Sequence, residues 1–411
     1  MRCYIRYITL AISFIIFNAH ALEINLQKQE NIISGDKYSF KSSVLDEERE
    51  IFISLPENYN HSAHHYPVIY VMDAEFLFDL TRSMVVIRAA RNYMPESIIV
   101  GISNNTDKRM HMALELYDDN GESFFYGDGL GQTDRYLKFF RNELIPNIEK
   151  QFRVNSHRTI IGMSPTFGPV LQAFWSEPDL FSGYIVLAAE IGKKLKSGET
   201  IGEKLIKAIS DKSRANASIY IGTGSRDIIK RGAKEAALYV DIPTKLKNIT
   251  NKNIRYKFEI VHDEDHYGMS IPGIQHGLET IYAREIWDIN YREFWKSDDP
   301  AQALMDKYKE LSEHYGFKII PIEKSYHFIH NIMKTAEILY RQKNTKDLIP
   351  WLILGTEYYP NSPAIYSQLS KAYVRAGNDK LAVKSAEKAV KLAEGTDDTN
   401  VYESLLETLI K

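Results

Sequence analysis

Apolar positions follow two patterns along residues 22–285, and each pattern predicts a different element. Residues 67–72 and 97–102 are near-continuous apolar runs, as is typical of strands buried on both faces of a parallel sheet. Residues 136–151 and 230–246 instead repeat their apolar side chains at helical spacing. Further strands are expected at residues 50–55, 160–161, 184–187, 218–221 and 256–260. Strands that alternate with helices predict an α/β fold with a mostly parallel central sheet flanked by helices.

The pattern changes after about residue 300, where small residues become frequent in helical segments. Residues 364–393 predict a helical hairpin whose small and aromatic positions match the tetratricopeptide pattern, and Pro360 stands where a preceding repeat would end. The repeat upstream, at residues 331–360, is degenerate. Because so few repeats cannot stack into a stable solenoid alone, we expect this tail to pack on the main domain, to dimerise or to bind a protein partner.

The first residues have the features of a secretory signal peptide. Arg2 and Arg6 precede the apolar run 8–17, and Ala19-His20-Ala21 follows as a cleavage site. The run is too short for a membrane anchor, which needs about 20 residues. We therefore expect a periplasmic or secreted protein with no membrane span after cleavage near Ala21. Its only cysteine, Cys3, would be removed with the signal.

These patterns divide the chain into four parts. They are a signal peptide at 1–21, an α/β domain at 22–290, a helical connector at 291–325 and a tetratricopeptide-like region at 326–411. Hydrophobic residues make up 44% and charged residues 26%, which is ordinary for a globular protein. The formal net charge of -3 gives no indication of nucleic-acid binding.

A candidate nucleophile lies in residues 159–168. The strand-like run 159–163 leads into a turn with Ser164 at its apex, and a helical segment follows. This is the arrangement of a nucleophile elbow, which usually reads Gly-x-Ser-x-Gly. Here Pro165 and Thr166 follow the serine, so Thr166 replaces the glycine that lets helix and strand approach closely. The alternative is a plain helix start, with Ser164 as N-cap and Pro165 at the first helical position.

Two residues further along the chain would complete a catalytic triad. Asp227 follows the predicted strand 218–221 and His266 follows the strand 256–260, which gives the chain order Ser, Asp, His. The alternatives are that Asp227 caps a helix near residue 229 and that His266 is a surface histidine. A metal site formed by His262 and His266 is less favoured, because no third ligand is evident. We expect neither a metal nor a cofactor.

The sequence resembles the putative-esterase family of α/β-hydrolases, which includes esterase D, feruloyl-esterase-like enzymes and enterobactin-type siderophore esterases. The resemblance covers residues 35–285. It rests on five blocks, namely 66–74, 98–102 with Arg109 downstream, 139–159, the Ser164 elbow and 177–181. It implies an α/β-hydrolase fold, Ser164 as nucleophile, His266 as general base and Asp227 as the acid. Ala74 would lend a backbone N–H to the oxyanion hole, beside Pro165 and Arg109 in the substrate pocket.

One departure from the family pattern bears directly on the chemistry. The residue after the nucleophile normally donates its N–H to the oxyanion, and Pro165 has none. Losing one such donor costs about 2.7–4 kcal/mol of transition-state stabilisation. The sequence thus supports an exported serine esterase that acts on a small-molecule ester. A catalytically impaired scaffold that binds through its pocket and tail is the alternative, and an acyltransferase is the second alternative. Siderophore, sugar and phenolic esters remain open as substrates, with selectivity expected in the polar loop 104–131.

Overall fold

The computed structural model describes residues 33–411 except 105, 231, 288–296 and 325–330. The predicted signal peptide, its cleavage site and Cys3 lie outside the described residues. Within the described ranges, no helix is both long enough and apolar enough to cross a membrane.

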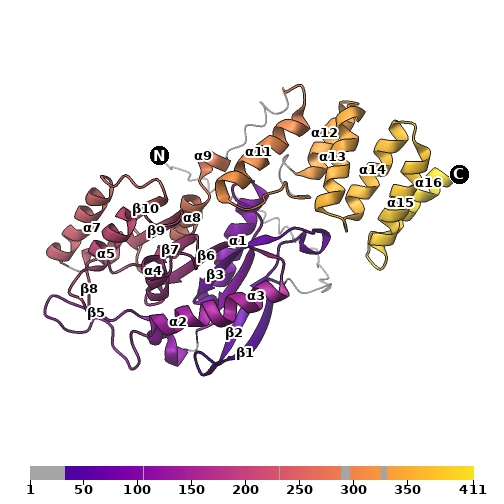
Figure 1. Cartoon of the computed structure of the whole chain (residues 1–411). Helices are drawn as coiled ribbons and strands as arrows, with labels where there is room; N and C mark the ends of the chain where they lie inside the picture. Colours follow the sequence, from indigo (N-terminus) through magenta and orange to yellow (C-terminus); the bar gives the residue numbers. More distant parts are fainter. Residues whose placement is uncertain (1–32, 105, 231, 288–296, 325–330) are drawn as a thin grey trace, which may run out of the picture. The chain divides into compact units, whose positions relative to one another are not determined.

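An eight-stranded sheet forms the centre of the chain, in the order β1-β2-β4-β3-β6-β7-β9-β10 (Figure 1). The strands are β1 (Asp36–Ser42), β2 (Glu47–Ser54), β3 (Tyr66–Met72), β4 (Ile98–Ile102), β6 (Val154–Met163), β7 (Gly183–Leu187), β9 (Ala217–Gly224) and β10 (Ile254–Val261). From β4 to β10 every neighbouring pair is parallel, whereas β1 and β2 are antiparallel additions at one edge. The expected α/β fold with a mostly parallel sheet is confirmed.

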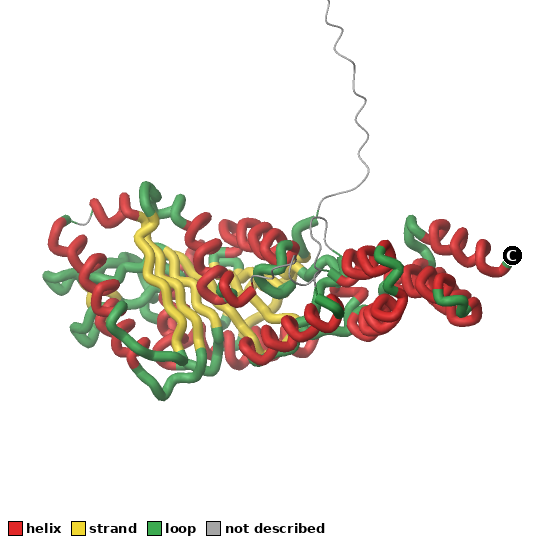
Figure 2. The backbone as a smooth tube through the Cα atoms, turned by 90° about the horizontal axis from the view of Figure 1, so that it is seen from above, coloured by secondary structure: helices red, strands yellow, loops and turns green. Residues whose placement is uncertain are grey.

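Helices cover both faces of this sheet (Figure 2). On one face α1 (Ala74–Ala90) and α8 (Ser270–Ile281) pack against the strands. The opposite face is covered by α2 (Thr133–Phe139), α3 (Ile145–Gln151), α4 (Phe167–Ser176), α5 (Ile201–Ser210) and α7 (Ala233–Leu246). The shorter elements are η1 (Tyr59–His61), η2 (Thr106–Met112), α6 (Ser225–Ile229) and α9 (Arg284–Trp287).

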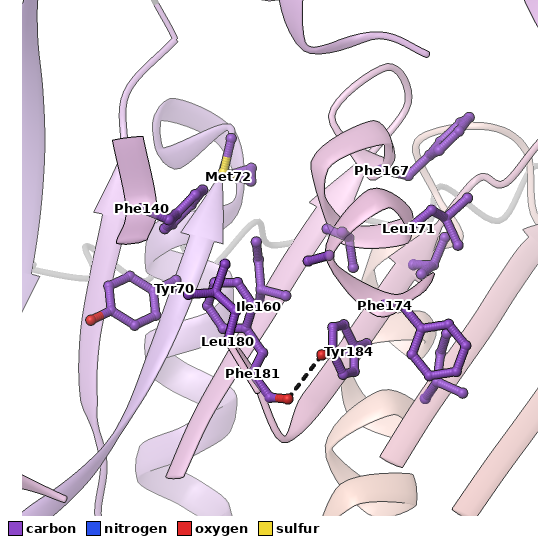
Figure 3. Close-up of a cluster of buried hydrophobic side chains, with 14 of the residues drawn as sticks. Tyr70, Met72, Phe140, Ile160, Phe167, Leu171, Phe174, Leu180, Phe181 and Tyr184 are labelled. Carbon is purple, nitrogen blue, oxygen red and sulfur yellow. Dashed lines mark hydrogen bonds between the residues drawn. The ribbon is translucent and has the colours of Figure 1, made fainter. Parts of the chain in front are cut away.

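Successive residues of each central strand are buried on opposite faces. In β7, Tyr184 belongs to the hydrophobic cluster under α4, while Ile185 belongs to the cluster under α1 and α8. Because both faces are apolar, the strand reads as a continuous hydrophobic run, as the sequence pattern predicted. Figure 3 shows the cluster that contains Tyr184. The buried hydroxyl of Tyr184 donates a hydrogen bond of 2.8 Å to the Phe181 carbonyl.

The helix expected at residues 136–151 is interrupted. α2 passes into a π-helical segment, η3 (Phe140–Leu144), and then into α3. Pro146 stands at the start of α3 and cannot donate the N–H that an uninterrupted helix would need there. The wider turn at η3 keeps Phe140 and Leu144 buried against the sheet despite this missing hydrogen bond.

The C-terminal third of the chain is helical. Its elements are α11 (Pro300–Tyr315), α12 (Ile332–Arg341), α13 (Thr345–Tyr358), α14 (Pro363–Arg375), α15 (Asp379–Ala393) and α16 (Thr399–Ile410). Trp351 and Ile365 of these helices share one hydrophobic cluster with Val71 of β3. Backbone bonds also join the two parts, since Ala63 donates to the Tyr358 carbonyl at 3.1 Å. The tail therefore packs on the α/β part, while its assignment as tetratricopeptide-like stays a prediction.

Candidate active site

Ser164 lies at the carboxyl edge of the sheet, immediately after β6. Its N–H donates to the carbonyl of Leu187 at the end of β7, at 3.3 Å. A tight turn over residues 164–166 separates the strand from α4, and the Ser164–Pro165 peptide bond is cis. α4 begins at Phe167 with Thr166 in the N-cap position. The alternative reading of Ser164 as N-cap with Pro165 as first helical residue is therefore wrong.

The turn differs from a nucleophile elbow in its backbone. An elbow holds its serine in a strained conformation. Ser164 is not among the described non-glycine residues with positive φ, whereas Asp73, at the end of β3, has a φ of 55°. Ala188, directly after β7, also has a positive φ, of 52°. The strained backbone positions described at this edge of the sheet therefore lie beside the serine and not at it.

Thr166 joins the turn to the neighbouring strand through its hydroxyl. This fully buried Oγ1 donates to the Asp73 carboxylate at 2.6 Å and accepts from the Met163 N–H at 2.9 Å. It also lies 2.7 Å from the Met163 carbonyl oxygen. Threonine at this position is a polar bridge between the elbow and β3.

The close approach of α4 to β6 does not need a glycine at position 166. A Cβ added to Gly162 would lie 2.3 Å from the carbonyl oxygen of Thr166, and one added to Gly168 would lie 2.2 Å from that of Met112. These distances are far below a normal contact. Gly162 therefore allows the close packing of α4 on β6 that was expected of the residue replaced by Thr166, and Gly168 allows the approach of α4 to the end of η2.

Arg109 links Asp73 to the turn through hydrogen bonds. Its Nε and Nη2 donate to the two carboxylate oxygens of Asp73 at 2.6 and 3.1 Å, and Nη2 also donates to the Ser164 carbonyl at 2.6 Å. Asn104 donates to the same carboxylate. Burial raises the pKa of Asp73, and the hydrogen bonds from Arg109 and Thr166 act against that rise. Arg109 thus contacts the backbone of Ser164, and a third of its side chain remains exposed.

Asp227 and His266 form a hydrogen-bonded pair. The carboxylate Oδ2 of Asp227 lies 2.9 Å from Nδ1 of His266. Asp227 is buried in the first turn of α6, directly after β9, and His266 lies in the turn after β10. A carboxylate on Nδ1 holds the imidazole so that Nε2 is the nitrogen left for proton transfer. The N-cap residue of α6 is Gly224, so the alternative in which Asp227 caps this helix is wrong.

Aromatic contacts bring the His266 turn towards the start of α1. The rings of His266 and Tyr267 lie edge to face at 5.1 Å, and Tyr267 lies edge to face with Phe76 at 5.8 Å. Phe76 is the third residue of α1, close to Ala74. Within the described part of the chain, however, the Ser164 hydroxyl forms no hydrogen bond with His266. Catalytic hydrogen bonds are often long before a substrate binds.

Ala74 is the first residue of α1, at the carboxyl end of β3. The N–H groups of Phe76 and Leu77 both donate to the Asp73 carbonyl at 2.9 Å. The earlier N–H groups of a helix have no partner within it and favour negative charge. The Ala74 N–H is thus suited to an oxyanion, whereas Pro165 offers no such donor.

No metal centre is apparent in the described ranges, where no group of three or more His, Cys, Asp or Glu side chains could hold an ion. His262 is 89% exposed and pairs with its neighbour Asp263 at 3.3 Å. His262 and His266 therefore have separate partners.

The polar loop 104–131 is largely fixed to the rest of the fold. It contains η2 and β5 (Leu116–Tyr117), and β5 pairs with β8 (Lys194–Leu195). Met112 and Leu116 are fully buried, while Tyr126 is 81% exposed. Because Arg109 belongs to η2, this loop also reaches the elbow.

Sequence reasoning missed the roles of Asp73, Asn104 and the Phe76–Tyr267 pair. Asp73 could have been found from its position, because a polar residue directly after a buried parallel strand lies at the edge that carries the site. The contacts of Asn104 and Phe76 join distant segments and leave no sequence signal.

Comparison with known proteins identifies the family. The model of the family described as "Putative esterase" matches residues 42–304, which is more than half of the chain. The chain belongs to this esterase family. A comparison with curated proteins finds no match.

Solved structures show the same fold. The IroE-like serine hydrolase of Shewanella oneidensis has a TM-score of 0.62 and 23% identity, over 76% of this chain and 96% of that one. An uncharacterised protein of Capnocytophaga ochracea matches with a TM-score of 0.56 and 19% identity, over 91% of this chain and 99% of that one. The BES protein of Bacillus cereus matches over 62% of this chain and 99% of its own, with a TM-score of 0.51 and 20% identity. These structures show the fold, and the family match supports a hydrolase that acts on small-molecule esters.

Proposed function

We propose that this protein is an exported serine esterase that hydrolyses carboxylic esters through an acyl-enzyme. The observation that carries the proposal is the Asp227–His266 hydrogen bond at the sheet edge where Ser164 also lies. Ser164 is the nucleophile, His266 the general base and Asp227 the residue that orients His266. Export rests on the sequence of residues 1–21.

The reaction proceeds in two halves. Nε2 of His266 removes the Ser164 proton as the oxygen attacks the ester carbonyl, and the tetrahedral intermediate expels the alcohol, which takes that proton. Water then enters, gives its proton to His266 and attacks the acyl-enzyme. The acid leaves as Ser164 recovers its proton. The Ser164–His266 hydrogen bond is not formed in this structure, and we expect it to form in the complex with substrate.

Stabilisation of the oxyanion sets the expected rate. The Ala74 N–H at the start of α1 supplies one donor. Without a donor at Pro165, we expect a turnover roughly a hundred- to thousandfold slower than that of an esterase with both donors. The substrate class is therefore best sought with activated aryl esters first, followed by siderophore, sugar and phenolic esters.

The deciding experiment is labelling of the folded protein with a fluorophosphonate, with the modified residue identified by mass spectrometry. We expect one label per chain, on Ser164. The Ser164→Ala variant should lose the label and lower aryl-ester hydrolysis by roughly a thousandfold or more. A folded protein that stays unlabelled would refute the proposal in favour of the impaired scaffold.

Replacement of Pro165 by glycine tests whether the missing oxyanion donor limits the rate of the enzyme. The new N–H should raise kcat if the missing donor limits the rate. An active wild-type enzyme whose kcat is unchanged would show that other donors serve the oxyanion. Product analysis with added alcohols tests the acyltransferase alternative, since transfer would give a new ester in place of the acid.

A further inference from the structure

The structure contains a cavity at the opposite end of α1 from the candidate active site. Its volume is about 480 Å³, which is within the range of small-molecule sites. The lining comes from the last turns of α1, the segment after β2, the start of β4 and residues Ile322 and Lys324. Val85, where the lining of the cavity begins, stands 11 residues after Ala74, so about 17 Å of helix separates the two.

The walls of the cavity are mainly apolar. Val85, Ala89 and Ile99 are buried side chains that form the interior surface. Val86 and Ile87 also belong to the lining but remain 50% and 61% exposed. Adjacent exposed aliphatic side chains beside an open cavity are unusual on a protein that binds nothing there.

One carboxyl group in this lining lacks a cationic partner. Glu96 is half-buried, and Asn58 Nδ2 donates a long hydrogen bond of 3.3 Å to its Oε1. Within the described ranges no Lys, Arg or His forms an ion pair with it. Burial raises the pKa of Glu96 to about 7, and the carboxylates of Glu57 and Glu323 act in the same direction.

The cations near the opening do not neutralise this carboxyl. Arg91 lies over the Tyr93 ring at 5.4 Å and donates to its hydroxyl at 3.4 Å. Lys324 is exposed and belongs to the lining without a bond to Glu96. Glu323 already bonds His61 and Ser362, and Glu57, the other carboxyl of the lining, is exposed. Glu96 is therefore the more buried carboxyl of the lining, and it has no cationic partner in the described ranges.

From this geometry we infer that the cavity binds a small cationic amphiphile, whose ammonium group pairs with Glu96 while its apolar body lies against Val85, Ala89 and Ile99. The ammonium supplies the charge that the protein does not, and the hydrocarbon covers the exposed aliphatic side chains. This site is separate from Ser164, so it does not depend on the proposed esterase activity.

Calorimetric titration with three probes of equal hydrocarbon length tests the inference. At pH 7.5, octylamine should bind with one site per chain, and octanol and octanoate should bind more weakly. Glu96→Gln should weaken octylamine binding at least about tenfold, because a charge-assisted hydrogen bond is lost. Lys324→Gln is the matched control at the opening and should not weaken octylamine.

A second variant guards against a folding effect of the Glu96 change. Val86→Trp alters a half-exposed lining residue and should block octylamine by filling the opening, with an unchanged thermal unfolding curve. Ser164→Ala should bind octylamine as the wild type does. Absence of octylamine binding, preference for octanoate, or equal affinity in Glu96→Gln would overturn the inference.

Discussion

Thr166 stands where a nucleophile elbow usually has a glycine, and its hydroxyl group links the turn to the end of β3. Its hydroxyl bonds both Met163 and Asp73, and Arg109 extends the connection from Asp73 to the Ser164 carbonyl. The position of Ser164 is therefore set by buried polar contacts. Pairwise bonds of this kind are costly to break, because each leaves a buried group without a partner.

Substitution of Thr166 tests that bridge. Thr166→Val keeps the shape but removes the hydroxyl, and should lower the free energy of unfolding by about 1–3 kcal/mol. Thr166→Ser retains the hydroxyl and should lose far less. Urea denaturation of the two variants measures the difference, and equal stability would show that the hydroxyl is not needed.

The His266 imidazole depends in the same way on one neighbour. Asp227→Asn should leave the fold intact but disturb the orientation of the ring, and so lower kcat by roughly 10²–10⁴-fold. Steady-state kinetics with an aryl ester, together with the thermal unfolding of the variant, would measure this. An unchanged kcat would mean that Ser164 and His266 act as a pair without an acid.

At the scale of elements, the strand–turn–helix unit depends on close packing between β6 and α4. The chain allows this because Gly162 has no Cβ where the Thr166 carbonyl and Val170 approach. The N-terminus of α4 is thereby held against the strand, and the turn with Ser164 lies at the sheet edge. α1 and α6, which follow β3 and β9, start at the same edge and carry Ala74 and Asp227.

A methyl group at Gly162 should disrupt this unit. Gly162→Ala would force backbone atoms apart and should destabilise the protein by about 1–3 kcal/mol while lowering activity. Gly192→Ala is the matched control, since its Cβ would meet only side-chain atoms, at 3.0 Å or more. Denaturation and aryl-ester kinetics on both variants would decide, and equal effects would contradict the close-packing argument.

At the scale of the whole molecule, the α/β part and the helical tail share contacts that the sequence did not suggest. His61 of η1 lies 2.8 Å from Oε2 of Glu323, and Ser362 at the start of α14 donates to the other oxygen. Glu323 is buried and half of His61 is exposed. This small cluster links three segments that are far apart in sequence.

The cluster should make the stability of the molecule depend on pH. The hydrogen bond to Glu323 raises the pKa of His61, followed by attraction to Glu323 and Glu57, with burial acting against them. Its stabilising contribution is complete below about pH 6.5 and is lost as pH rises through the higher folded-state pKa. Because His61 is half exposed, the contribution should be only about 0.5 kcal/mol.

His61→Asn should therefore destabilise the protein near pH 6 and leave it unchanged near pH 9. His65→Asn is the control, since His65 is exposed and makes no ion pair in the described part of the chain. Denaturant titrations at both pH values provide the measurement. A difference that grows with pH would contradict the sign of the argument.

Most strands and the order of the candidate catalytic residues were determined by the sequence itself. Short continuous apolar runs are typical of strands buried on both faces, and strands that alternate with helices indicate a mostly parallel sheet. In such a sheet the residues that follow the strands meet at one edge, which is why Ser164, Asp227 and His266 could be named. The edge strand β1 was missed, because its side chains are mostly exposed and its apolar alternation is limited to Tyr38 and Phe40.

Only the tertiary structure decided how the turn at Ser164 is held. Three contacts join residues more than 30 positions apart. They are the hydrogen bonds from Thr166 and Arg109 to Asp73 and the ring contact of Phe76 with Tyr267. No local pattern encodes such pairs, since each depends on which strands become neighbours. The cavity beside Glu96 arises for the same reason, from segments that meet only after the whole chain has folded.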